Sequence, residues 1–207
     1  MELKSKLVIC GSSHATRLYQ ACQRNANLKE KYSIIGNTRP GATWYNFKLD
    51  KGLLEQLGAN DVVIIQFLGN DLIKPEIKRT FNPKIIHLLQ FIPRSDAYVK
   101  TVREHLKKFL INVKAKIYFI DDPYRHLSCC PAHAHSHPEL LKYLVKRNRE
   151  LKEIFSEYTV FDHRRLIKSM SFGKISHMSY YRKIMDDDVH MKENFYDEWA
   201  ESLSTRI

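Results

Sequence analysis

The stretch LVICGSSHATRL, residues 7–18, passes from a strand-like pattern to a helix-like pattern within a few residues. Four apolar residues precede Gly11, Ser12 and Ser13, and from Ala15 onward apolar side chains recur at the spacing of one helix face. A serine at such a strand-to-helix turn stands on a rigid elbow, which is a common position for a nucleophile. It is also a common position for an ordinary helix cap. The stretch predicts a β–α unit and leaves both roles open for its serines.

The same alternation of strand-like and helix-like patterns continues along the chain. Short runs rich in Val, Ile, Tyr and Phe predict strands, and apolar residues at helical spacing predict helices between them. The predicted strands are Lys6–Cys10, Tyr32–Ile35, Asp61–Phe67, Lys116–Ile120 and Tyr158–Phe161, and the main helical patterns cover residues 15–22, 99–113, 141–155 and 195–203. The run Val62–Ile65 is apolar at every position, as is typical of a central parallel strand. The pattern predicts a doubly wound, three-layer α/β/α sandwich with a mostly parallel five-stranded sheet, formed by residues 1–207 as a single domain.

Two stretches break this regular alternation. Residues 74–95 contain three prolines among apolar residues, and residues 121–137 follow the fourth predicted strand. We expect the first to be an irregular insertion that folds over the sheet and borders a pocket. Both follow predicted strands, and ligands of open α/β sheets bind outside the carboxyl ends of the strands.

The composition limits the classes of function. The chain of 207 residues carries a formal net charge of +11 and contains no run of 18 apolar residues, so we expect no membrane span. The positive charge favours contact with nucleic acid or an acidic membrane surface. Lys142, Lys146 and Arg149 share one helix face and are the candidate nucleic-acid-binding residues, although a solvated basic face is the simpler interpretation.

The cysteines and the first residues bear on the cellular compartment. Four cysteines at irregular spacing do not suggest a disulfide scaffold. The first six residues, MELKSK, lack the apolar run of a signal peptide. These features predict a reducing, cytoplasmic location, with the nucleus as the alternative.

Polar residues and glycines follow the predicted strands or precede the last helix. Gly41 lies in RPGATW after the second strand, and Asn70 lies in FLGND after the third. Asp187 and His190 lie in DDDVHMKENF before the last predicted helix. Ligands of open α/β sheets bind outside the carboxyl ends of the strands, so these positions are candidates for a functional site.

These motifs, in this order, resemble the conserved blocks of the SGNH (GDSL-like) hydrolases over nearly the whole chain. The resemblance implies the flavodoxin-like version of the sandwich and a serine esterase that needs no metal or other cofactor and acts on a small carboxylic ester, with a short acyl group such as acetyl. It makes Ser13 the nucleophile, His190 the base and Asp187 the residue that orients His190. The oxyanion hole would consist of the Ser13 amide, Gly41 and Asn70.

The chemistry requires these residue types. A serine hydroxyl is a weak nucleophile unless a neighbouring imidazole removes its proton, and a carboxylate fixes the tautomer of that imidazole. A backbone N–H at a glycine and an asparagine amide are neutral donors for a developing oxyanion. Gly-Ser12-Ser13 departs from the Gly-Asp-Ser of the family, and Leu68 replaces the first glycine of Gly-x-Asn-Asp.

Each motif also has a structural alternative. Either Ser12 or Ser13 suits a helix cap, Gly41 suits a turn after Pro40, Asn70 suits a cap of a short helix, and His190 suits an ordinary surface histidine. Asp186 and Asp188 flank Asp187 and are alternatives to it, although the three-residue spacing to the histidine favours Asp187.

The first motif, GSSHATRL, also resembles SGNH domains of retrotransposon-encoded proteins, including the esterase domains of LINE-type first-frame proteins. That narrower resemblance implies a basic domain that works beside RNA. The main alternative function is therefore a catalytically weak or inactive module of this fold that binds RNA through its basic surface. The simultaneous presence of Ser13, Asn70, Asp187 and His190 favours the esterase.

The segment HLSCCPAHAHSH, residues 126–137, concentrates thiols and imidazoles that are able to bind zinc. Its spacing matches no standard zinc finger, and the alternative is a polar loop over the active-site end of the sheet. We therefore predict no metal.

Overall fold

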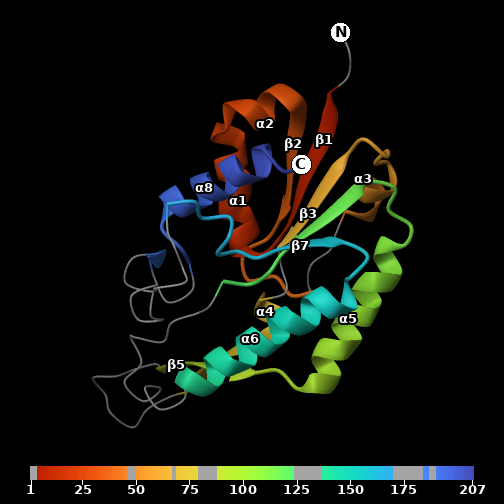
Figure 1. Cartoon of the computed structure of the whole chain (residues 1–207). Helices are drawn as coiled ribbons and strands as arrows, with labels where there is room; N and C mark the ends of the chain where they lie inside the picture. The colour runs from red at the N-terminus through yellow and green to blue at the C-terminus, as the bar shows by residue number, and fades with distance from the viewer. Residues whose placement is uncertain are drawn as a thin grey trace.

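The central sheet of the computed structural model has five parallel strands in the order β2-β1-β3-β6-β7 (Figure 1). These strands are β1 (Ser5–Gly11), β2 (Tyr32–Thr38), β3 (Val62–Gln66), β6 (Lys116–Ile120) and β7 (Thr159–Phe161). Every adjacent pair is parallel, as the strand-then-helix pattern predicts. The predicted five-stranded α/β fold is confirmed, with strand bounds that differ by one to three residues at most ends.

The structure describes residues 4–45, 50–66, 69–78, 88–123, 137–169, 184–186 and 190–207. Of residues 51, 69, 73–78, 88–93 and 137–141 it describes the backbone alone. Among these described residues, no helix is both long and apolar enough to cross a lipid bilayer.

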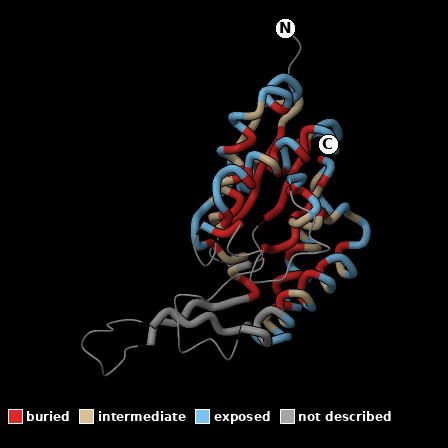
Figure 2. Tube along the Cα trace, turned by 60° about the vertical axis from the view of Figure 1, so that its left-hand side comes forward, coloured by how far each residue is buried: buried red, intermediate tan, exposed pale blue. Residues whose placement is uncertain are grey.

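Two layers of helices cover the two faces of the sheet (Figure 1). One layer consists of α1 (Ser13–Arg24), α2 (Ala26–Lys31) and α8 (Glu193–Ser204), and the other of α3 (Lys51–Glu55), α5 (Asp96–Leu110) and α6 (His137–Ile154). Alternate side chains of β1 enter the two layers: Leu7 and Ile9 pack toward α1 and α8, whereas Val8 and Cys10 pack toward α5. Figure 2 shows buried strands between helices whose outer faces are exposed.

The predicted irregular insertion contains regular structure. The short helix α4 (Gly69–Leu72) leads into β4 (Ile73–Lys78), which pairs antiparallel with β5 (Leu88–Pro93) in a separate two-stranded sheet. The prediction of an irregular stretch over residues 74–95 was therefore wrong for these strands. Pro75 and Pro93 argued against strands, but a two-stranded sheet has free edges where a missing N–H is tolerated.

Candidate active site

The turn between β1 and α1 brings Ser13 to the carboxyl edge of the sheet. Gly11 has a φ of +153°, and a Cβ on it would lie 2.1 Å from the Gln66 carbonyl oxygen and 2.7 Å from the Ala15 Cβ. Only a glycine, which has no Cβ, lets the end of β1 come this close to the end of β3 and the start of α1. Because α1 begins at Ser13, directly after the turn, the Ser13 amide belongs to the unpaired N–H groups of a helix start.

Ser13 and His190, which are far apart in the sequence, are in hydrogen-bonding contact. The Oγ of Ser13 lies 2.8 Å from the Nε2 of His190. Ser12 is the N-cap residue of α1, but its side chain makes no capping hydrogen bond. Ser12 is buried, whereas Ser13 and His190 are each partly exposed. The geometry therefore favours a reactive hydroxyl at Ser13 over the helix-cap interpretation of these serines.

A short antiparallel bridge holds His190 in place. Met185 pairs with Met191, the Asp186 amide donates to the His190 carbonyl at 2.9 Å, and the Lys192 amide donates to the Ile184 carbonyl at 2.8 Å. The bridge therefore holds residues 184–186 beside residues 190–192. Asp187, the predicted orienting carboxylate, and its alternative Asp188 lie outside the described residues.

The other alternative carboxylate, Asp186, is described. Its Oδ2 lies 3.7 Å from Nη1 of Arg17 on α1, and its side chain is 61% exposed. Asp186 thus has a cationic partner at the surface, which argues against it as the carboxylate that orients His190.

The loop after β2 places Gly41 near the end of β1. Gly41 has a φ of +73°, and the Ala42 amide donates to the Arg39 carbonyl at 3.1 Å, as in a β-turn with glycine at its third position. The turn interpretation of Gly41 therefore matches its backbone. The Arg39 amide also donates to the Gly11 carbonyl at 2.9 Å, so this loop is bound to the turn that precedes Ser13.

Asn70 ties the loop after β3 to the loop after β2. Its Nδ2 donates to the Ala42 carbonyl oxygen at 3.0 Å. Asn70 lies within α4, so its side chain links the two loops that carry the predicted oxyanion donors. Leu68, which departs from the family motif, lies outside the described residues.

Asp71, for which no role was predicted, makes the second tie between these loops. Its two carboxylate oxygens accept hydrogen bonds from the Trp44 amide at 2.9 and 3.1 Å, and the Tyr98 hydroxyl donates to one of them at 3.2 Å. Asp71 is 1% exposed, and this burial raises its pKa to about 7 although the Trp44 bond acts in the opposite direction. The one sequence feature that could have indicated a role for Asp71 was its position beside Asn70, shortly after a fully buried strand.

The predicted basic face is only partly free of acidic partners. Lys142, Lys146 and Arg149 are all exposed on α6. The Nζ of Lys146 lies 3.8 Å from Asp96 and 3.7 Å from Glu150, so its charge is offset locally. These acidic partners argue against a continuous positively charged surface along α6.

The candidate metal ligands divide into two groups. His126–Ser136 lie outside the described residues, and of His137 the backbone alone is described, so the predicted absence of a metal there stays a prediction. Within the described part of the chain, the ligand atoms of Asp121, Asp162 and His163 lie within 4.8 Å of one another. The Nζ of Lys152 lies 3.5 Å from Asp121 and 3.8 Å from Asp162, so both carboxylates already have a cationic partner.

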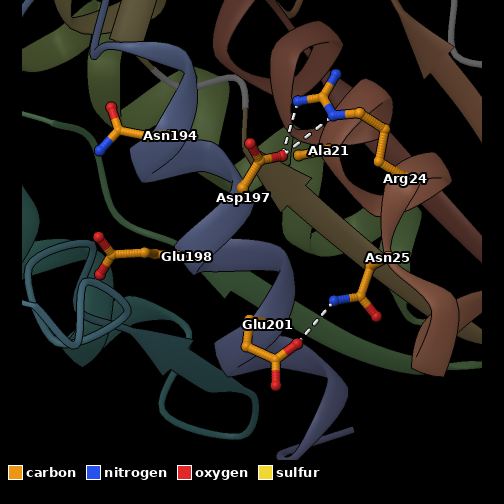
Figure 3. A pocket seen from close by; sticks show the side chains of 7 residues that line it. All are labelled: Ala21, Arg24, Asn25, Asn194, Asp197, Glu198 and Glu201. Carbon is orange, nitrogen blue, oxygen red and sulfur yellow. Dashed lines mark hydrogen bonds and ion pairs between the residues drawn. The ribbon is translucent and has the colours of Figure 1, made fainter.

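Figure 3 shows a groove between α1 and α8, whose lining includes neither Ser13 nor His190. It has a volume of about 490 Å³ and is lined mainly by charged and amide side chains that include Arg24, Asp197 and Glu201. Arg24 donates to Asp197 at 2.7 Å, and Asn25 donates to Glu201 at 2.9 Å. Its lining starts at Ala21, about 12 Å along the helix axis from Ser13.

Solved structures of several hydrolases share this fold. A GDSL-like lipase from Bacteroides thetaiotaomicron superposes with a TM-score of 0.60 at 12% identity, covering 98% of this chain and 87% of its own. An acetylxylan esterase from Geobacillus stearothermophilus gives 0.59 at 15%, with 98% and 94% covered. The aryl esterase of M. smegmatis gives 0.59 at 13%, with 98% and 97% covered. No protein-family model and no curated protein matches the sequence.

The chain thus has the fold of the GDSL-like hydrolases. At such identities the likeness establishes the arrangement of strands and helices, and the chemistry has to be argued from the side chains at the carboxyl edge of the sheet.

Proposed function

We propose that this protein is a serine esterase of the SGNH type, in which residues 1–207 form one catalytic domain. The observation that carries the proposal is the 2.8 Å contact between Ser13 Oγ and His190 Nε2. It lies at the carboxyl edge of a parallel sheet, where such folds place their ligands. The shared fold with a lipase and two esterases supports the same conclusion.

The reaction proceeds through an acyl-enzyme. Ser13 Oγ attacks the ester carbonyl carbon while His190 Nε2 takes the hydroxyl proton. The imidazolium then gives this proton to the departing alcohol, which leaves the acyl group on Ser13. Water attacks the acyl-enzyme with His190 again as base, and the acid and free Ser13 are released. Asp187 is the proposed carboxylate that orients His190 and stabilises its imidazolium.

Three neutral donors are proposed for the oxyanion. The Ser13 amide lies at the start of α1, where the helix dipole favours negative charge. The Gly41 amide belongs to the turn that is bound to the Gly11 carbonyl, and a Cβ on Gly41 would meet no atom within 4 Å. Asn70 Nδ2 is the third proposed donor, and the same amide group donates to the Ala42 carbonyl oxygen at 3.0 Å. One such donor typically contributes about 10²–10³ in rate.

The proposed substrate is a small ester with a short acyl group, acetyl above all. The neighbours include an acetylxylan esterase and a carbohydrate acetylesterase from Sinorhizobium meliloti, and the proposal extends their acyl group to this chain. The mechanism needs no metal or other cofactor. We therefore expect the protein to remain folded and active in EDTA, and stoichiometric zinc whose removal lowers the melting temperature would contradict this.

The direct test is hydrolysis of p-nitrophenyl esters from acetyl to octanoyl by the wild type and by Ser13→Ala. We expect activity to be highest for the shortest chains and to disappear in Ser13→Ala, and a fluorophosphonate adduct to map to Ser13. Ser33→Ala, an exposed serine on β2, is the matched control. Wild-type rates in Ser13→Ala would refute the assignment.

The second hypothesis is an RNA-binding module of the retrotransposon type, in the cytoplasm or the nucleus. The net charge of +11 favours it, and the acidic partners of Lys146 disfavour it. We expect weak binding to single-stranded RNA that disappears between low and moderate salt, because scattered cations act by counterion release. The triple variant Lys142→Glu, Lys146→Glu and Arg149→Glu should bind RNA more weakly still. Sequence-dependent binding at high salt would favour this hypothesis over the esterase.

A further inference from the structure

His14, the neighbour of Ser13, is joined to the segment that carries His190. Its side chain is 2% exposed, and its Nδ1 lies 2.7 Å from the hydroxyl of Tyr196 on α8. Tyr196 is fully buried, and its hydroxyl accepts a hydrogen bond from the Met191 amide at 3.4 Å. A chain of polar contacts therefore runs from the residue after the proposed nucleophile to the residue after the proposed base.

A second side chain of α1 holds the same residue. The Nη1 of Arg17 donates to the Met191 carbonyl oxygen at 3.2 Å. Both the amide and the carbonyl of Met191 are thus anchored by α1, one through Tyr196 and the other directly. Since Ser13 starts the same helix, α1 fixes the position of His190 relative to Ser13.

The polarity of this buried pair requires an explanation. An imidazole and a phenol hydroxyl lose hydration on burial, and an apolar pair would fill the space between α1 and α8 without that loss. Hydrogen bonds between them add direction that apolar packing lacks. A defined orientation of His14 matters here because the centroids of the His14 and His190 rings are only 5.3 Å apart, so a rotation of one ring would change the surroundings of the other.

We propose that His14 and Tyr196 are positioning residues that hold the Met191 backbone, and with it His190 Nε2, within reach of Ser13 Oγ; this rests on the proposed esterase function. In this arrangement the Tyr196 hydroxyl accepts from the Met191 N–H and directs its own hydrogen to His14 Nδ1.

The first test is Tyr196→Phe, which removes one oxygen. We expect kcat to fall about 10- to 100-fold with KM changed less than about twofold, because misplacement of the base slows the chemical step and leaves substrate binding intact. Tyr19→Phe is the matched control, since its hydroxyl lies on α1 and contacts only Gln23 among the bonds described for it. An unchanged kcat in Tyr196→Phe overturns the proposal.

The second test compares two replacements of His14. Asn keeps an acceptor near the position of Nδ1, whereas Leu does not, so His14→Asn should retain most of the kcat that His14→Leu loses. The double variant His14→Leu with Tyr196→Phe should lose no more than the worse single variant, because both act through one chain of contacts. Equal activity of the Asn and Leu variants, or fully additive losses, contradicts the proposal even where Tyr196→Phe folds poorly.

The third test does not depend on turnover. Amide exchange of Met191 and the NMR signals of the His190 ring are compared between wild type and Tyr196→Phe. Faster Met191 exchange and a displaced His190 signal support positioning, and unchanged spectra refute it. If the wild type hydrolyses no ester, the proposed function fails, and these spectra still decide whether His14 and Tyr196 hold the histidine segment.

Discussion

His163 and His190 each have a close side-chain partner, and they differ in what surrounds them. His163 Nδ1 lies 2.6 Å from Asp121 Oδ1, and the His163 amide donates to the same oxygen at 2.7 Å. His190 contacts Ser13 at 2.8 Å. The contact of His163 with the Asp121 carboxylate is shorter than that of His190 with the Ser13 hydroxyl, yet the His163 side chain is 0% exposed.

The difference shows that a short histidine–carboxylate contact does not by itself identify a catalytic base. The carbonyl of His163 also accepts from Trp199 Nε1 at 3.0 Å, so this residue joins the end of β7 to α8 within the core. His190 is partly exposed and lies beside a hydroxyl at a helix start. Access for substrate and a neighbouring nucleophile distinguish the two positions. The following predictions test this distinction, from the largest expected effect to the smallest.

The largest effect is expected for His190→Ala. Without the imidazole, the Ser13 hydroxyl has no base, and activity should fall by about 10³-fold or more, nearly as far as in Ser13→Ala. The melting temperature should change little, because the His190 ring is only partly buried. His105→Ala, an exposed histidine on α5, is the control for both histidine predictions. Retention of activity in His190→Ala would place the base elsewhere.

The second effect is expected for His163→Ala and concerns stability. Removal of the buried ring leaves a cavity and deprives Asp121 of a partner, so the free energy of unfolding should drop by about 2–4 kcal/mol. Activity per folded molecule should remain near that of the wild type when assayed well below the melting temperature. Urea unfolding and initial rates measure the two quantities. A loss of activity without a loss of stability would reverse the assignment of these histidines.

The two histidines also show what the sequence was able to predict. Runs rich in Val, Ile, Tyr and Phe identified all five parallel strands, most clearly β3, whose burial at every position leaves a continuous apolar pattern. The contact between Ser13 and His190 spans 177 residues, and only the resemblance to known motifs connected them. The contact of His163 with Asp121 and that of His14 with Tyr196 have no such motif, because side-chain pairing between distant elements leaves no local periodicity.

Asp71 extends the comparison to buried carboxylates and is expected to have a smaller effect. Its hydrogen-bond donors described here are the neutral Trp44 amide and Tyr98 hydroxyl, whereas Asp121 faces His163 and Lys152. Burial raises the pKa of Asp71 to about 7 from 3.8, so the folded state binds this proton more tightly than the unfolded chain. Its contribution therefore favours folding near pH 4–5 and diminishes as the pH rises through 7.

Asp71→Asn tests this contribution, because its neutral amide oxygen still accepts a hydrogen bond from the Trp44 amide. The free energy of unfolding of the variant, relative to the wild type, should rise by about 1–3 kcal/mol between pH 5 and pH 8. Denaturant unfolding at several pH values measures it. Glu104→Gln, at an exposed position on α5, should show no such trend. A difference that falls or stays constant with pH would show that Asp71 is not held neutral by burial.

The smallest effect is expected for Ser12→Ala, which extends the comparison from the two histidines to the neighbouring serines Ser12 and Ser13. Ser12 is the N-cap of α1 but its side chain makes no capping hydrogen bond, so the usual cost of about 1 kcal/mol for losing a cap should shrink to a few tenths. Its carbonyl, which the substitution keeps, accepts the Thr16 amide at 3.0 Å. Ser12→Ala should therefore keep most of its esterase activity and its melting temperature, while Ser13→Ala keeps the melting temperature and loses activity. Ester hydrolysis and thermal unfolding of the two variants, measured side by side, check this. Equal loss of activity in both would mean that the hydroxyl of Ser12 takes part in the reaction, and that the contact of Ser13 with His190 is not sufficient to identify the nucleophile.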